Sequence, residues 1–115
     1  MYQFSYADVQ EDGVAEARER EREAINHSIS LLNAAKANGL ESRDAIEAVY
    51  FVSRLWVRFV EDLASPDNQL AEELRANLIS IGIWIIKESE RIRKRESDNF
   101  QGIIDISIII RDGLK

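Results

Sequence analysis

Few side chains in this sequence could carry out chemistry, and their spacing does not build a catalytic site. His27 is the only histidine, and cysteine is absent. A nucleophilic triad needs a histidine beside a serine, but helical spacing places His27 on a polar flank with Glu16 and Arg20, away from any serine. A di-iron bundle needs Glu-x-x-His pairs on two helices, whereas Glu23 precedes His27 by four residues and nothing else matches.

The signatures of cofactor sites are missing as well. The sequence contains no phosphate loop, dinucleotide fingerprint or calcium loop. Acidic residues are scattered over positions expected to face water rather than gathered on a core face. We therefore expect a protein that is not an enzyme, with no catalytic residue, no metal ion, no cofactor and no small-molecule substrate.

The composition is that of a small, acidic, helical domain. The chain has 115 residues, of which 45% are hydrophobic and 31% charged, and its formal net charge is −6. One proline and five glycines argue against a turn-rich β architecture, and the negative charge disfavours bulk attraction to nucleic acid or an anionic membrane. The longest uncharged stretches, 24–35 and 76–86, are shorter than the ~20 residues of a membrane span. The N-terminus lacks a signal-peptide pattern, so we expect one cytoplasmic domain over residues 1–115.

Apolar residues at helical spacing predict an all-α fold, a four-helix, antiparallel bundle-like domain with short connections. Asn38-Gly39 supplies a left-handed stop, Ser42 a helix N-cap, and Pro66 a helix break. The helices are expected near residues 13–38, 42–64, 69–96 and 98–113.

Two segments leave alternatives open. Residues 1–11 carry aromatic rings at Tyr2, Phe4 and Tyr6, which suit an extended segment packed on helices, a frayed terminus, or the approach to a helix. The β-branched residues of 98–113 also suit a strand. We favour a helix there, because helical spacing aligns Phe100 with four later residues: Ile103, Ser107, Ile110 and Leu114.

The third helix is expected to lie at the centre of the bundle. Ile79, Ile83 and Ile86 fall almost opposite its main apolar line, and a helix apolar on both sides is usually packed between neighbours. Gly82 removes a side chain from this helix, which would let another element approach closely. The cations near its end fit the negative pole of a helix dipole, while specific RNA binding is the alternative reading of the same residues: Lys87, Arg91, Arg93, Lys94 and Arg95.

Some apolar residues exceed what the core requires and are candidates for binding a partner. Ile104 and Ile108 widen the apolar arc of the last helix beyond its core line. The second helix carries a similar strip beside its main stripe, formed by Ile46, Tyr50 and Val57. If the strips adjoin, they form an exposed groove, and such patches usually mark protein contacts. The alternative is that a helix or the N-terminal aromatic residues cover them.

The two tryptophans receive different expectations. Trp56 lies on the main stripe of the second helix and is expected in the core. Trp84 either packs near a helix–helix contact or belongs to the partner-binding surface, because tryptophan is enriched among interface hot spots.

The whole chain resembles the FlaF family of bacterial flagellar biosynthesis proteins. The resemblance rests on several segments, of which the most distinctive are Arg54-Leu55-Trp56 and Leu78-Ile79-Ser80-Ile81-Gly82-Ile83-Trp84. The other segments are Tyr2-Gln3-Phe4-Ser5-Tyr6-Ala7, Glu61-Asp62-Leu63-Ala64, Pro66-Asp67-Asn68-Gln69-Leu70, Asn99-Phe100 and Ile110-Arg111-Asp112-Gly113-Leu114. Relatives often have a proline where this chain has Ala71, which affects a helix start.

The resemblance implies a non-enzymatic role in flagellin synthesis and secretion, with flagellin as a direct, chaperone-like binding partner. The family's effect is exerted alongside or against the regulator FlbT. Translational control through flagellin messenger RNA, directly or with FlbT, is the alternative function, and a structural oligomer paired through the spare strips is a third. The candidate partner-binding residues are Ile46, Tyr50, Val57, Trp84, Ile104 and Ile108.

Overall fold

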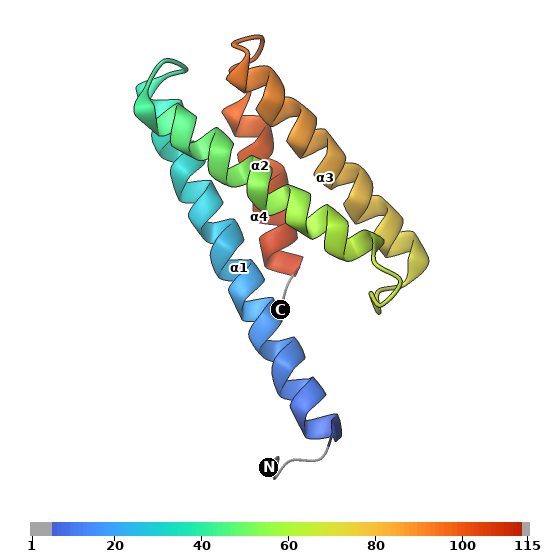
Figure 1. Ribbon diagram of the computed structural model, residues 1–115. Helices are drawn as coiled ribbons and strands as arrows, with labels where there is room; N and C mark the ends of the chain where they lie inside the picture. The colour runs from blue at the N-terminus through green and yellow to red at the C-terminus, as the bar shows by residue number, and fades with distance from the viewer. Residues whose placement is uncertain (1–5, 114–115) are drawn as a thin grey trace.

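The computed structural model describes residues 6–113, with the side chains of residues 15–113. Four helices make up this part of the chain (Figure 1), which confirms the predicted all-α class and leaves no strand among the described residues. They are α1 (Tyr6–Asn38), α2 (Arg43–Ala64), α3 (Glu72–Arg93) and α4 (Phe100–Gly113). The last segment, for which the sequence suited either a strand or a helix, is therefore helical.

Local signals explain most helix ends. The Ser42 side chain accepts a hydrogen bond from the Ala45 amide at 3.1 Å and caps α2 as predicted. Gly39 takes a positive φ of 92° after α1, a conformation that glycine adopts without steric cost. Arg95 takes a φ of 62° and ends α3, so this helix stops at Arg93 rather than at residue 96.

Two helix starts differ from the expected positions. α1 begins at Tyr6, so most of the segment left open is helical, whereas Tyr2 and Phe4 lie outside the described residues. α3 begins at Glu72 rather than at residue 69. The Asn68 side chain accepts a hydrogen bond from the Leu70 amide at 3.0 Å, and this turn delays the helix.

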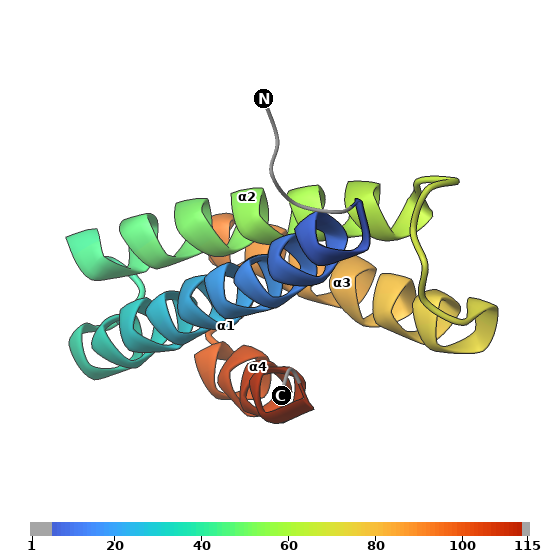
Figure 2. The ribbon, with the colours of Figure 1, turned by 90° about the horizontal axis from the view of Figure 1, so that it is seen from below.

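The central helices are α1 and α2, not α3. α2 packs against α1 and α3, and α1 packs against α2 and α4. Figure 2 shows α2 and α4 on opposite sides of α1. The prediction of a central third helix is wrong, because α3 packs chiefly on α2 and leaves Ile83 41% exposed. Its two-sided apolar pattern arises from one side that enters the core and another that borders solvent.

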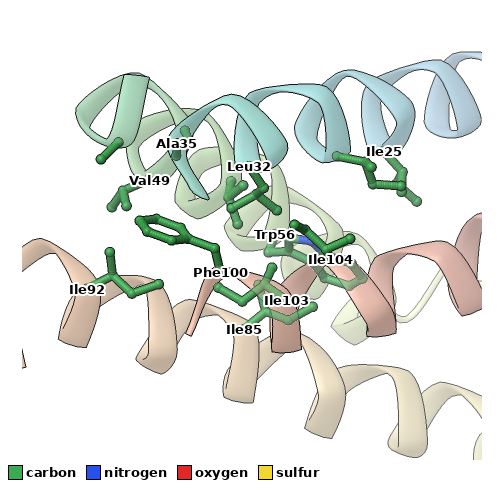
Figure 3. Packing of buried hydrophobic residues seen from close by; sticks show 14 residues of the cluster. Ile25, Leu32, Ala35, Val49, Trp56, Ile85, Ile92, Phe100, Ile103 and Ile104 are labelled. Atoms are coloured by element: carbon green, nitrogen blue, oxygen red, sulfur yellow. The ribbon is translucent and has the colours of Figure 1, made fainter. Parts of the chain in front are cut away.

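The core is a single cluster to which all four helices contribute (Figure 3). Trp56 of α2 is 2% exposed and is the largest buried side chain, as its place on the main stripe predicts. Around it lie buried isoleucines and a phenylalanine, among them Ile25, Ile85, Phe100 and Ile103. Small residues are fully buried as well and leave room for neighbouring helices: Ser28, Ala35, Ala48 and Ser107.

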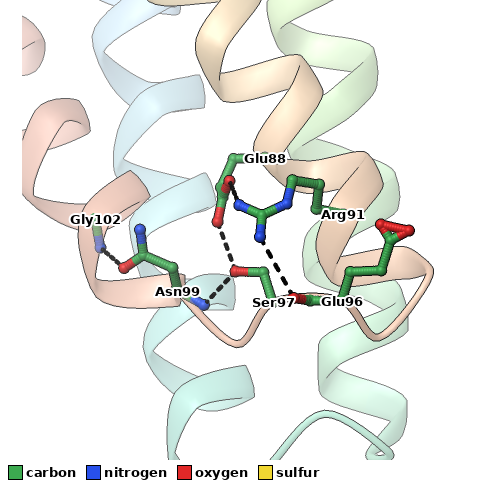
Figure 4. Close-up of polar contacts among 6 residues, drawn as sticks. All are labelled: Glu88, Arg91, Glu96, Ser97, Asn99 and Gly102. Carbon is green, nitrogen blue, oxygen red and sulfur yellow. Dashed lines mark hydrogen bonds and ion pairs between the residues drawn. The ribbon is translucent and has the colours of Figure 1, made fainter.

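A polar cluster fixes the turn between α3 and α4 (Figure 4). The Glu88 carboxylate is buried and accepts hydrogen bonds from Arg91 at 2.8 Å and from the Ser97 hydroxyl at 2.5 Å. Ser97 also accepts from the Asn99 amide, and the Asn99 side chain accepts from the Gly102 amide, each at 3.0 Å. Asn99 thereby caps α4, and the buried carboxylate holds the start of α4 against the end of α3.

Candidate partner-binding site

The predicted strip on α2 is exposed. The exposed fractions are 68% for Ile46, 64% for Tyr50 and 43% for Val57. None of the three belongs to the buried cluster, which uses the neighbouring side of α2 through Ala48, Val52 and Trp56. Of the two alternatives that the sequence left open for this strip, exposure and not coverage by another helix is therefore the one observed.

The strip continues onto α3. Trp56 and Gly82 mark the contact between α2 and α3. Val57 lies about 100° around α2 from Trp56, and Ile83 lies about 100° around α3 from Gly82. Because the two helices run antiparallel (Figure 1), these rotations lead to the same face of the pair. We call this surface the outer face; it consists of the exposed Ile46, Tyr50 and Val57 on α2 and Ile83 on α3. Ile79 and Ile86 of α3 lie at the same rotation but are half-buried, and Ile86 also packs against the core cluster.

One end of the outer face is hollowed. A depression of about 330 Å³ lies between the start of α2 and the end of α3. Its apolar lining includes Leu40, Ile46, Val49 and Ile92, and its polar lining includes Arg54, Glu90, Arg93 and Arg95. The bottom of the depression is apolar and arginines lie around it. This arrangement suits an apolar side chain of a partner that has a negatively charged residue beside it.

Each of these arginines is engaged differently. Arg93 donates to the Glu90 carboxylate with an Nε to Oε2 distance of 2.9 Å, and this hydrogen bond lowers the pKa of Glu90 below its usual value. Arg95 pairs with Glu41 at 3.0 Å. Arg54 instead donates to the Tyr50 hydroxyl at 3.0 Å and lies over its ring, 5.3 Å from the centroid.

The predicted contribution of α4 to the partner surface is wrong. Ile104 is 3% exposed, and Ile108 is half-buried and packed against the core cluster. The physical reason is that α4 contacts α1 in addition to the central core, so it needs an apolar arc wider than one line of residues. The exposed apolar residue on α4 is Ile109, at 66%.

Trp84 is exposed, but it does not lie on the outer face. It is 43% exposed and borders a second hollow, of about 280 Å³, with Ile81, Gly102 and Ile106. This hollow lies between α3 and α4. At 3.6 residues per turn, Ile81 lies about 100° and Trp84 about 160° around α3 from Gly82, in the direction opposite to Ile83. The six candidate residues therefore divide into three on the outer face, one at the α3–α4 hollow and two in or against the core.

Two features of the surface were not predicted from the sequence. Leu70, just before α3, and Leu74, in its first turn, are 41% and 48% exposed, although helical spacing aligns them with the main apolar line of this segment. A wider groove of about 700 Å³ separates α1 from α2 and is lined in part by Glu21 and Asp62. Burial, followed by the charge of Asp62, raises the pKa of Glu21.

The residues that could do chemistry stay apart. His27 is exposed, and its ring stands edge-on to Phe51 with 4.8 Å between centroids. Among the described side chains, no group of three or more acidic or histidine residues could hold a metal ion. Within the described residues, no helix combines the length and apolar character that crossing a bilayer requires.

Comparison with known proteins gives one match. The family described as Flagellar protein FlaF matches residues 2–114, nearly the whole chain. No curated protein and no solved structure matches the sequence. The match spans all four helices, so the chain belongs to the FlaF family of flagellar proteins.

Proposed function

We propose that this protein binds flagellin as a non-enzymatic, chaperone-like partner in the cytoplasm and so promotes flagellin synthesis or secretion. Family membership supports a flagellar role. The observation that carries the finer proposal is the outer face, where Ile46, Tyr50, Val57 and Ile83 are each more than 40% exposed. A domain that keeps such residues in water gains from covering them with a partner.

The physics of the partner suits this surface. Flagellin's terminal segments are amphipathic and pack as helices only in the assembled filament, so a monomer exposes apolar faces before export. A helical domain can bind such a segment by laying it along an apolar groove. Burying one large aliphatic side chain contributes about 1.5–3 kcal/mol, so three or four anchors suffice for specific binding.

Direct action on messenger RNA has less support. The cations at the end of α3 are largely paired with carboxylates, through Arg91–Glu88, Arg93–Glu90 and Arg95–Glu41. RNA binding usually relies on cations free to contact phosphates and weakens steeply with salt. We therefore propose that any effect on translation passes through a protein partner.

The test is a pull-down of purified flagellin monomer by the full-length chain, with flagellin messenger RNA offered in a parallel reaction. We expect a stoichiometric complex with flagellin and none with the RNA. Failure to retain flagellin, or salt-sensitive retention of the RNA alone, would contradict the proposal.

A further inference from the structure

We propose that the segment bound by the outer face is an amphipathic helix with acidic side chains beside its apolar ridge, and that Arg54 selects for that charge. This inference rests on the proposed flagellin binding and adds the site and the chemistry of the segment. It follows from the shape of the outer face, from the charges at its rim and from the contrast with the second hollow.

The shape of the outer face suits a helix. Ile46, Tyr50 and Val57 span twelve residues of α2, and the rise from the first to the last is about 16 Å or three helical turns. The apolar residues of α3 run alongside in the antiparallel direction. A shallow trough between two helices, lined on both sides by apolar residues, is the geometry into which the apolar ridge of a third helix packs.

The rim of the depression indicates the charge of the ligand. Three arginines line it, Arg54, Arg93 and Arg95. Arg93 is paired with Glu90 and Arg95 with Glu41, so Arg54 is the lining arginine without a carboxylate partner among the described side chains. This unpaired positive charge contrasts with the formal net charge of −6 for the whole chain. A ligand with basic residues at this place would meet like charges, whereas carboxylates would be attracted.

Arg54 is the cation best placed to respond to a ligand. Among the described side chains, it forms no salt bridge with a carboxylate, unlike Arg93 and Arg95. Its contacts with the Tyr50 ring and hydroxyl hold the guanidinium beside the apolar strip. An acidic residue next to the apolar ridge of a docked helix would reach a cation whose position is already fixed.

The hollow between α3 and α4 has a different character. Its lining residues are Ile81, Trp84, Gly102 and Ile106, none of which is charged. Such a lining favours an apolar side chain but does not select the charge beside it. If the partner bound at this hollow, its affinity would respond little to charge reversal or to salt. If it bound at the outer face, both should change its affinity.

The experiment measures the affinity of flagellin monomer for the full chain and four variants, at low and high ionic strength. Ile46→Asp removes an apolar anchor of the outer face, and Ile109→Asp is its matched control, since Ile46 is 68% and Ile109 66% exposed. Arg54→Glu reverses the proposed selecting charge. Arg58→Glu is its control, because Arg58 is exposed on the same helix. Both arginines border the groove toward α1, but only Arg54 also lines the depression on the outer face.

We expect Ile46→Asp to weaken binding about tenfold or more and Arg54→Glu about fivefold to tenfold, with both controls near wild type. High salt should weaken the wild type more than Arg54→Glu, because screening acts on the charge that the variant lacks. Unchanged thermal melting of the variants verifies that they fold.

The outcomes separate this inference from the function on which it rests. If the wild type binds flagellin and Ile46→Asp and Arg54→Glu bind equally well, the site and its charge selection are wrong while flagellin binding stands. If the wild type does not bind flagellin, the proposed function fails and the inference fails with it. Overlapping peptides of flagellin provide a second probe: the bound peptide should carry a net negative charge, and a basic one would overturn the charge selection.

Discussion

Gly82 of α3 lies directly against Trp56 of α2. A Cβ atom built on Gly82 would stand 3.1 Å from Cε3 of Trp56 and 2.6 Å from Cγ2 of Val60. Both distances are shorter than ordinary van der Waals contact. The missing side chain at Gly82 thus sets how closely α2 and α3 approach, and with it the width of the outer face.

Gly82→Ala should therefore destabilise the protein, although alanine favours helices by ~1 kcal/mol over glycine. Overpacking of this kind costs about 1–3 kcal/mol, to be measured by chemical denaturation. Gly13→Ala on α1 is the control, because a Cβ there would meet nothing within 4 Å. Equal stability of Gly82→Ala and Gly13→Ala would show that the helices tolerate the extra methyl group.

Replacing the two tryptophans with alanine should lower the stability of the protein to different extents. Trp56→Ala should lower the free energy of unfolding by about 3–5 kcal/mol, the usual cost of removing a buried aromatic ring, because Trp56 is 2% exposed. Trp84→Ala, at a residue that is 43% exposed, should cost less, about 1–2 kcal/mol, because only part of its apolar surface is buried. Denaturation curves of both variants give the comparison, and a larger loss for Trp84→Ala would contradict the packing described.

Ile104→Asp should prevent folding, whereas Ile109→Asp should leave the fold intact. Ile104 is 3% exposed in the core, and Ile109 is 66% exposed on the same helix. Burying an unpaired carboxylate costs several kcal/mol, a large fraction of the ~5–15 kcal/mol that stabilises a domain. Circular dichroism melting distinguishes the two, and a folded Ile104→Asp protein would show that this side of α4 is free.

Stability should also depend on Glu21 in a pH-dependent way. Burial and the neighbouring Asp62 raise the pKa of Glu21 above the usual 4.5, so the folded state binds its proton more tightly than the unfolded state does. Ionisation of Glu21 therefore costs stability as the pH rises through the raised pKa. Glu21→Gln removes that cost and should raise the melting temperature at neutral pH.

The difference between Glu21→Gln and wild type should shrink as the pH falls and vanish below the usual glutamate pKa, where the carboxyl is protonated in both states. Glu23→Gln, at an exposed position of the same helix, controls for the change in net charge. A benefit of Glu21→Gln that grows in acid would have the wrong sign for this explanation.

Sequence patterns correctly predicted the features that are determined within one helix. Ser42 and Gly39 set helix ends through local hydrogen bonding and backbone conformation, and the spacing of Ile46, Tyr50 and Val57 placed them in a strip beside the core stripe. Each of these properties is fixed within a few residues along the chain, which is why the sequence alone sufficed.

Sequence patterns did not predict which apolar side chains are covered by neighbouring helices. The rotation of Ile104 around α4 places it beside the core line, but whether α1 covers that position depends on how the helices assemble. The two-sided pattern of α3 fits a central helix as well as a helix with one side in the core and one side toward solvent. The exposure of Ile83 in the structure decides between these two arrangements.

Photo-crosslinking to flagellin is the most direct test of the central claim that the outer face binds the partner. A photoreactive amino acid is placed at position 50 on the outer face in one sample and at position 109 on α4 in another, both exposed in the free protein. We predict a crosslink to flagellin from position 50 and none from position 109. A crosslink from position 109 alone, or from neither position, would contradict the claim.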